Sequence, residues 1–392
     1  MAEWIEKRLD EIVEFNPRDA IKKDVIAKKI AMDKLQPFCR DITGFELEPF
    51  SGGAKFRNGD TIMARITPCL ENGKTAKVNI LDDGEVGFGS TEYIVFRAKE
   101  GIDTDFVYYL AVSPIVREPA IKSMVGSSGR QRVQIDVVQS IIVMLPTLEE
   151  QKAIAGVLKS LDDKIAVNKK INDNLEQQAE ALFQYLFIDN ASTDWSEGIL
   201  SDLGTIVGGS TPSKAKQEYY TTQGIAWITP KDLSINRSKF ISHGENDITE
   251  LGLKNSSVSI MPEGTVLFSS RAPIGYIAIA ASEVTTNQGF KSVIPKADVG
   301  TAFVYYFLKH SLPIIEGMAS GSTFKEVSGS TMKSVPAVIP DRETLQKFRV
   351  LCAPIFTQQR TLEKQNQSLA ALRDSLLPKL MSGEIDVSSI QL

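Results

Sequence analysis

The sequence repeats itself at long range, and this repeat constrains the fold more than any other feature. The opening pattern returns at the same spacing in the second half of the chain, with Trp4, Glu6, Leu9 and Ile12 matched by Trp195, Glu197, Leu200 and Leu203. Later landmarks keep a nearly constant offset, as in Tyr109 and Tyr306, Pro146 and Pro340, and Leu186 and Leu380. The repeat predicts two copies of one module, related by an internal approximate twofold axis and presenting two similar surfaces.

Composition places the chain among ordinary globular proteins. Its 392 residues, 42% hydrophobic and 24% charged, are enough for two or three domains. A net charge of −5 argues against indiscriminate nucleic-acid binding, but it allows a local basic face. The first residues contain no apolar run, and no stretch approaches a membrane span, so we expect a cytoplasmic protein. Cys39, Cys69 and Cys352 are too few and too scattered for a disulfide framework or a zinc site.

Each module is expected to be a mixed α/β (α+β) domain with irregular, loop-rich sheets. The first, residues 1–146, opens with a short helix or turn at 4–13 and contains apolar-alternating runs typical of strands at 61–65 and 93–97. A short helix is expected at 106–116 and a β-branched strand at 137–145. The second module, residues 188–340, repeats this order, with strands at 265–268, 291–294 and 335–339 and a helix at 303–309.

After each module the apolar period changes to a heptad pattern, which predicts long helices at 147–187 and 342–382, the latter within a distal segment 341–392. The first seam contains Ile154, Leu158, Leu161, Ile165, Asn168, Asn172, Leu175, Leu182 and Leu186. The second contains Phe348, Cys352, Ile355, Leu362, Asn366, Leu369, Leu376 and Leu380. A helix with one apolar stripe must bury it against a partner. A helical hairpin or a homodimer zipper would serve, but the repeat favours an antiparallel coiled coil within one chain.

Several seam residues depart from the apolar pattern. The three asparagines fit a role in fixing register, and tolerance of polar residues in a wet middle is an equal alternative. Cys352 is interpreted as a small buried hydrophobe rather than a reactive thiol. Pro354 is expected to kink or restart the second helix near its beginning.

No constellation for catalysis is found in the sequence. There is no phosphate-binding loop, and the glycines at 86–89 indicate a β-turn. Residues 16–19, Asn-Pro-Arg-Asp, lack the second proline and the aromatic residue of an adenine methyltransferase motif. His243 and His310 are too isolated for a triad or a metal cluster. We therefore expect a chain that is not an enzyme and has no catalytic residue, metal site or cofactor of its own.

Three segments carry a family resemblance: 145–154, beginning Leu-Pro-Thr-Leu-Glu-Glu-Gln; 376–385, beginning Leu-Leu-Pro-Lys-Leu; and 195–203, followed by Gly-Gly-Ser-Thr-Pro-Ser at 208–213. With the order module, helix, module, helix, the whole chain resembles the specificity (S) subunit of type I restriction-modification systems. One departure is visible, because residues 341–346 replace the acidic run that opens the first helix.

The resemblance implies two target-recognition domains, 1–146 and 188–340, that each read half of a bipartite DNA site. It implies that the helices are spacers and docking platforms for two methyltransferase subunits. S-adenosylmethionine is expected on those partners, and motor-nuclease subunits are expected in the full complex. Two other readings remain: a protein-interaction scaffold with two duplicated binding domains, and a self-contained methyltransferase.

DNA readout requires Arg, Lys, Asn, Gln and Ser on loops that can enter the major groove. Candidates in the first module are Lys55, Arg57, Arg65, Lys74, Ser127, Ser128, Arg130, Gln131 and Arg132. Candidates in the second are Lys214, Lys216, Tyr219, Lys231, Arg237, Arg271, Asn287, Gln288, Lys291, Ser322 and Lys325. Any one of them, taken singly, is more often a solvated surface residue. The loops differ between the copies, since Arg132 faces Glu326 in the alignment, so we expect two different half-sites and an asymmetric full site.

Overall fold

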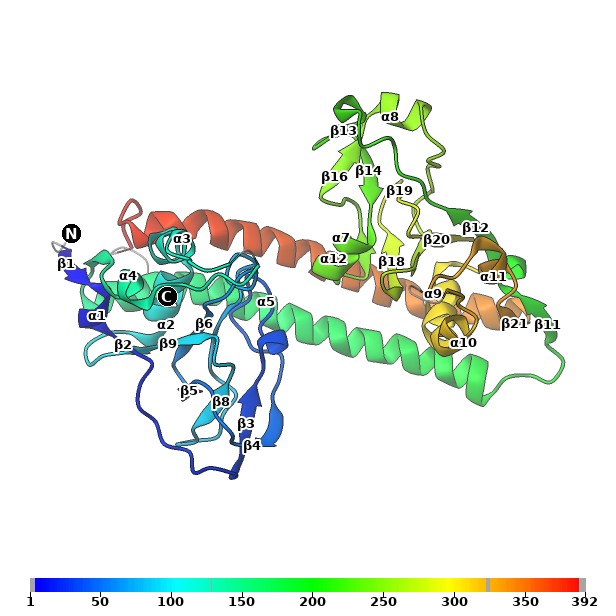
Figure 1. The fold of residues 1–392 in the computed structure, drawn as a ribbon. Helices are drawn as coiled ribbons and strands as arrows, with labels where there is room; N and C mark the ends of the chain where they lie inside the picture. Colours follow the sequence, from blue (N-terminus) through cyan, green and yellow to red (C-terminus); the bar gives the residue numbers. More distant parts are fainter. Residues whose placement is uncertain (1–3, 128, 322–324, 388–392) are drawn as a thin grey trace. The chain divides into compact units, whose positions relative to one another are not determined.

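The computed structural model describes residues 4–127, 129–321 and 325–387 (Figure 1). The chain forms two compact units. Unit 1 contains the residues up to 167 and those from 366 onward, and unit 2 contains residues 168–365. Each unit therefore combines one module with part of both long helices.

The module of unit 1 contains three small sheets. Strands β1 (Ile5–Arg8) and β10 (Ile142–Leu145) form an antiparallel pair. A second sheet has the order β2 (Val13–Phe15), β9 (Tyr93–Ala98), β6 (Thr61–Ala64), β7 (Thr75–Lys77). A third has the order β4 (Glu46–Pro49), β3 (Ile26–Ile30), β8 (Gly87–Gly89), β5 (Lys55–Phe56). The helices are α1 (Leu9–Ile12), α2 (Thr104–Val112), α3 (Pro114–Lys122), α4 (Ile135–Gln139) and a 3₁₀ turn at Met32–Lys34.

The module of unit 2 follows the same plan. Strands β11 (Ser196–Ile199) and β21 (Pro336–Ile339) pair. The larger sheet has the order β12 (Gly204–Gly208), β20 (Lys291–Pro295), β17 (Val266–Ser270), β18 (Ile274–Ala280), β15 (Phe240–Ile241). The other has the order β13 (Tyr220–Thr221), β16 (Asn246–Ile248), β14 (Ile225–Ile228), β19 (Thr285–Thr286). The helices are α6 (Leu200–Leu203), α7 (Pro230–Ile235), α8 (Glu250–Lys254), α9 (Thr301–His310), α10 (Leu312–Gly317), α11 (Gly329–Lys333) and a 3₁₀ turn at Gln217–Tyr219.

The strand order β2-β9-β6-β7 in unit 1 is repeated as β12-β20-β17-β18 in unit 2. Parallel pairing occurs in both units, between β3 and β8 in unit 1 and between β14 and β19 and between β15 and β18 in unit 2. The expected mixed α/β class, with duplicated modules and irregular sheets, is confirmed. None of the helices in the part of the chain described here is long and apolar enough to cross a membrane.

Several local expectations differ from the structure. Gly87–Gly89 form strand β8 rather than a β-turn. The short helix expected at 4–13 is confirmed only in part, because helix α1 spans Leu9–Ile12 but strand β1 precedes it and pairs with β10, a partner far away in sequence. Residues 137–139 belong to helix α4, so only the end of the β-branched run forms a strand. The helix expected at 106–116 is two helices, because α2 ends at Val112 and Pro114 begins α3. Proline is well tolerated at the first position of a helix, where the backbone N–H would have no acceptor within the helix.

The long helices are α5 (Leu148–Phe183), which continues as a π-helical turn at Gln184–Asp189, and α12 (Arg342–Met381). In unit 1 the start of α5, at Ile154 and Leu158, lies in the same core as the end of α12, at Leu377 and Leu380. In unit 2 the end of α5 packs on the beginning of α12, where the rings of Phe183 and Phe348 are 6.0 Å apart. The two helices are therefore antiparallel in each unit.

Seam burial is uneven. The buried seam residues are Ile154, Leu158, Asn168, Leu175, Leu186, Phe348, Cys352, Leu362 and Leu380. The half-buried ones are Leu161, Ile165, Asn172, Leu182, Ile355, Asn366, Leu369 and Leu376. Helix α12 is a single element through Pro354, so the helix does not restart there.

Candidate nucleic-acid interface

In unit 1 two of the expected loops lie side by side at the end of strand β6. An isolated bridge joins Ile66 to Arg132, in the loop 125–133. The guanidinium of Arg132 donates to both carboxylate oxygens of Glu92, at 2.7–3.0 Å. Arg65 approaches the same carboxylate, with its Nε 3.9 Å from Glu92 Oε2. The hydrogen bonds with Glu92 raise the pKa of Arg132. One acid thus orients two arginines on one edge of the module.

Unit 2 contains a similar cluster at the same place. The backbones of Arg271 and Glu326 form an isolated β-bridge, as those of Ile66 and Arg132 do in unit 1. Arg271 Nη1 lies 3.3 Å from one oxygen of Glu326, and Lys291 Nζ lies 3.8 Å from the other. Again one carboxylate serves two cations, but here the acid comes from the loop and the cations come from the sheet.

Arg65 follows strand β6 and Arg271 follows the equivalent strand β17, but the two arginines do not occupy equivalent positions. The carbonyl of Arg65 accepts a hydrogen bond from Val133 N at 2.8 Å, and the carbonyl of Ser270 accepts one from Val327 N at 3.0 Å. The counterpart of Arg65 is therefore Ser270, and Arg271 lies one residue further along. Successive residues of an extended chain point to opposite faces, so the two units present their arginines differently.

A second basic group in unit 1 is tied to Asp19. Arg57 Nη2 lies 2.7 Å from this carboxylate, and Lys55 Nζ donates to the Asp19 carbonyl at 2.7 Å. Burial opposes ionisation of Asp19, but Arg97 and Arg57 outweigh it and keep its pKa below the ordinary value. Lys55 and Arg65 both line an open cavity of about 580 Å³ beside Asp19.

The remaining candidates of unit 1 differ in exposure. Ser127 and Arg130 are exposed at the tip of the loop 125–133, and Gln131 beside them is half-buried. Ser128 lies outside the described residues. Lys74 donates to the Met32 carbonyl at 2.9 Å, so its ammonium supports the module's own fold.

In unit 2, two loops meet where exposed Gln288 contacts the Thr211 hydroxyl. Beside Gln288, Asn287 Oδ1 accepts a hydrogen bond from Gly289 N at 2.8 Å. A side chain at Gly209 would lie 1.9 Å from the Asn287 carbonyl, which explains the glycine at this close approach.

The other candidates of unit 2 differ in their exposure and contacts. Lys214 and Lys216 are exposed, and Lys216 Nζ lies 5.5 Å from the ring of Tyr219, which is itself buried. Lys231 pairs with Glu245 at 2.5 Å, and Arg237 borders a separate recess. Lys325 is exposed, whereas Ser322 lies outside the described residues.

The acids and the buried contacts that hold the modules on the helices could not be recognised in the sequence. In unit 1, Asp162 of α5 accepts from Tyr109 Oη at 2.8 Å and from Arg373 of α12 at 2.6 Å. In unit 2, Glu176 of α5 accepts from Tyr306 Oη at 3.0 Å and forms an ion pair with buried Lys239. The repeated tyrosines were visible in the sequence, but their partners follow no repeat.

Comparisons with known proteins agree on one family. The chain matches the type I restriction modification DNA specificity domain twice, over residues 1–177 and 192–367. It is 41% identical over 192 residues to the type I restriction enzyme MjaIX specificity subunit of Methanocaldococcus jannaschii, a match that covers 48% of this chain and 44% of that relative. It is 25% identical over 407 residues to the HindI specificity subunit of Haemophilus influenzae, covering 84% of this chain and 87% of that relative.

One solved structure supports the fold. The S subunit of a type I restriction-modification system from M. genitalium aligns over 96% of both chains, with a TM-score of 0.54 and 15% identity.

Proposed function

We propose that this chain, which belongs to the family of type I restriction modification DNA specificity domains, reads a bipartite, asymmetric DNA site with one unit for each half-site. The chain serves as a specificity subunit and leaves the chemistry to its partners. The observation that carries this proposal is the pair of cation clusters at equivalent edges of the two modules.

Each cluster has the groups that base recognition requires. Arginine can donate to guanine O6 and N7 together, and a neighbouring carboxylate fixes the plane of its guanidinium. Arg132 and Arg65 share Glu92, whereas Arg271 and Lys291 share Glu326. The acid and the cations come from different segments in the two units. The two edges therefore offer different patterns of hydrogen-bond donors. Different patterns select different bases, which supports an asymmetric site.

Other exposed lysines of unit 2 fit contacts with the phosphate backbone. Lys214, Lys216 and Lys325 are exposed, and a flexible ammonium suits a phosphate better than a base edge. Such contacts add affinity and salt dependence without sequence information. The chain's net charge of −5 keeps the nonspecific part of the affinity small.

The proposal also assigns partners. Two methyltransferase subunits dock on the helices and the adjoining edges of the modules, and they hold the S-adenosylmethionine. Motor-nuclease subunits join the complete restriction complex. The repeated architecture supports two similar docking places, and the different openings of α5 and α12 support unequal affinities.

The test is sequence selection by the assembled complex. The chain and its methyltransferase subunit are mixed with a pool of randomised duplexes, and the retained DNA is sequenced after several rounds. The proposal expects two short fixed blocks of different sequence, separated by a spacer of constant length. A complex that retains no duplex would favour a protein-interaction scaffold instead. Methylation by the chain without a partner would favour a self-contained methyltransferase.

A further inference from the structure

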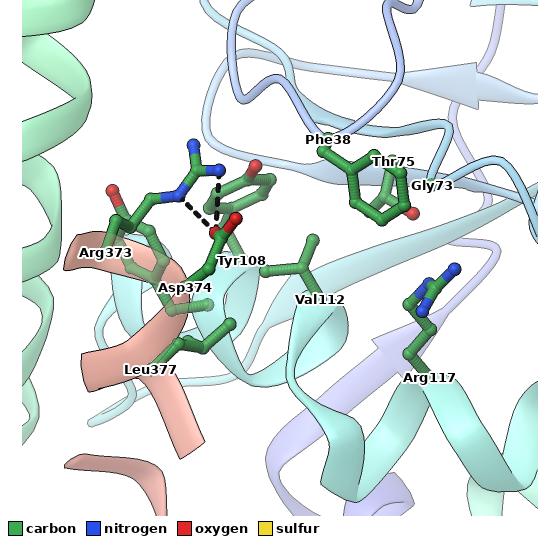
Figure 2. Close-up of a pocket in the computed structure, with 10 residues that line it drawn as sticks. Phe38, Gly73, Thr75, Tyr108, Val112, Arg117, Arg373, Asp374 and Leu377 are labelled. Carbon is green, nitrogen blue, oxygen red and sulfur yellow. Dashed lines mark hydrogen bonds and ion pairs between the residues drawn. The ribbon is translucent and has the colours of Figure 1, made fainter. Parts of the chain in front are cut away.

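Unit 1 contains a recess bordered by its module and the C-terminal part of α12 (Figure 2). Tyr108 and Val112 of α2 lie at its centre, with Arg373 and Asp374 on one side and Phe38 and Arg117 on the other. Its volume is about 50 Å³. About 10–15 Å³ of such space is enough for one water molecule, so the recess accepts a small group such as a carboxylate.

Phe38 is held at the rim in an unfavourable conformation. Its φ of 54° is uncommon for a bulky residue, and its side chain is 55% exposed. The ring packs on Gly73, where an added Cβ would lie 2.6 Å from it. Strained backbone positions of this kind persist only where the surrounding structure holds them, and they cluster at functional sites.

Arg117 of α3 lies against this ring, with its guanidinium carbon 5.2 Å from the ring centre. Its Nη2 donates to the Glu71 carbonyl at 2.8 Å, but its buried Nε has no acceptor among the described residues. The neighbouring acid, Glu118, forms an ion pair with Lys122 at 3.6 Å. Burial lowers the pKa of Arg117, which has no carboxylate bonded to it in the described part of the chain. A guanidinium in this position lacks the anionic acceptor that it normally has.

We propose that this recess receives an acidic side chain of a protein partner, whose carboxylate bonds Arg117 and whose aliphatic stem packs on Phe38. The inference rests on the proposed function, in which the partner is the methyltransferase subunit. A protein fits better than DNA, because Asp374 lines the recess, Glu118 follows Arg117 in the chain and Arg117 bonds the carbonyl of Glu71, so that a row of phosphates would meet several acids. A single carboxylate can reach Arg117 without approaching all three.

Unit 2 contains a recess at the equivalent place. The carbonyl of Arg40 accepts from Lys77 N at 2.9 Å, and that of Lys239 accepts from Ile279 N at 2.7 Å. This register makes Arg237 the counterpart of Phe38.

The same register pairs Gly73 with Gly275, and both have positive φ, 71° and 96°. Arg237 and Gly275 line a recess of about 300 Å³. Arg237 is exposed and has no acidic partner in the parts of the chain that the structure describes. The second unit thus offers one arginine for the same kind of contact, so each unit takes one copy of the partner.

The experiment titrates the full chain with its purified methyltransferase subunit and reads stoichiometry by native mass spectrometry. Arg117→Ala should weaken one of the two binding steps by roughly tenfold to hundredfold, because it removes one partner of a desolvated charge pair. Arg237→Ala should weaken the other step, and the double variant should weaken both. Lys122→Ala is the matched control, because it removes a cation from the same helix outside the recess, and it should bind as the parent chain does.

Phe38→Gly separates docking from folding. Glycine accepts positive φ without strain, so the unfolding midpoint should stay the same or rise while the first binding step weakens. Unchanged binding by both Arg117→Ala and Phe38→Gly would overturn the inference and leave the proposed function standing. So would a lower DNA affinity at unchanged stoichiometry, which would assign the recess to nucleic acid. If the parent chain bound no methyltransferase subunit, the proposed scaffolding would fail, and this inference with it.

Discussion

Arg40 and Lys239 occupy equivalent positions in the two units, and each is a buried cation that joins its module to helix α5. Their side chains are buried, and they pair with Asp163 and Glu176, respectively. Arg40 Nη1 lies 2.7 Å from Asp163, whereas Lys239 Nζ also donates to Tyr306 Oη at 3.0 Å and to Gln359 Oε1 at 2.9 Å. The repeat therefore preserves a cation–acid contact but changes the chemistry of both partners.

The Glu176 contact should make unit 2 sensitive to acid. Burial opposes ionisation, but Lys239 and Lys309 outweigh it and lower the pKa of Glu176 to about 2, from an ordinary value near 4.5. Because the folded pKa is depressed, the stabilisation is complete above pH 4.5 and is lost as the pH falls toward 2. Its upper limit is on the order of 3 kcal/mol.

Glu176→Gln should therefore lower the free energy of unfolding at neutral pH and flatten its decline between pH 5 and roughly pH 2. Denaturant titrations over this range, followed by circular dichroism, measure both effects. Asp173→Asn, which changes an exposed acid on the same helix, is the control and should retain the parent pH profile. Parallel profiles for Glu176→Gln and the parent would contradict this assignment.

The burial of each seam residue predicts how much stability its substitution should cost. Leu158 is fully buried between α5 and α12 in unit 1, whereas Leu161 is half-buried. Leu158→Ala should cost about 2–5 kcal/mol of stability, and Leu161→Ala clearly less. Chemical denaturation of both variants checks the order. Equal losses would mean that α5 and α12 do not pair in this register.

The arginines of the two clusters should act on separate half-sites. Arg132→Ala should reduce base discrimination at one half-site by about 1–3 kcal/mol, and Arg271→Ala should do so at the other. Lys216→Ala, which removes an expected phosphate contact, should instead weaken all duplexes equally and reduce the salt dependence. Binding of single-base variants of the selected site by the methyltransferase complex distinguishes these results.

Glu92 should affect specificity without touching DNA. Glu92→Ala frees Arg132 and Arg65 from their shared acceptor, so nonspecific affinity should rise while discrimination at that half-site falls. The same complex and duplexes provide the measurement. A uniform loss of affinity would show that Glu92 only supports the fold.

Cys352 should be inert in the folded chain. It is buried on the α12 seam, and burial raises the pKa of its thiol to about 12. Cys39 and Cys69 are half-buried and should react faster with iodoacetamide. Mass spectrometry of digested samples locates the label. Modification of Cys352 at the rate of the other two under native conditions would be incompatible with a packed seam.

Long-range regularities in the sequence predicted the architecture well, because they reflect burial that both copies must satisfy. The heptads identified α5 and α12, and the repeated tyrosines Tyr109 and Tyr306 marked equivalent helices. The expected restart at Pro354 does not occur, because packing along one face of α12 outweighs the loss of one backbone hydrogen bond. Strand β1 was missed, because its partner β10 is far away in sequence and its own four residues show no clear alternation.

The candidate site was predictable only in part. Cations on matching loops were recognisable by residue type, and the structure brings Arg65 to Arg132 and Arg271 to Lys291. The acids that organise them, Glu92 and Glu326, could not be chosen among the many acids of the chain, because their role depends on loop contacts without periodicity. For the same reason the sequence could not show that Lys74 bonds the Met32 carbonyl or that Tyr219 is buried.

The central claim is that each unit reads its half-site independently, and exchange of one module tests it most directly. Residues 195–340 are replaced by the corresponding residues of a relative, the hybrid is produced with its methyltransferase subunit, and methylated sites are mapped across a genome. We expect one half-site to change to that of the relative while the other half-site and the spacer remain. Simultaneous change of both half-sites, or of neither in an active complex, would contradict independent readout by two units.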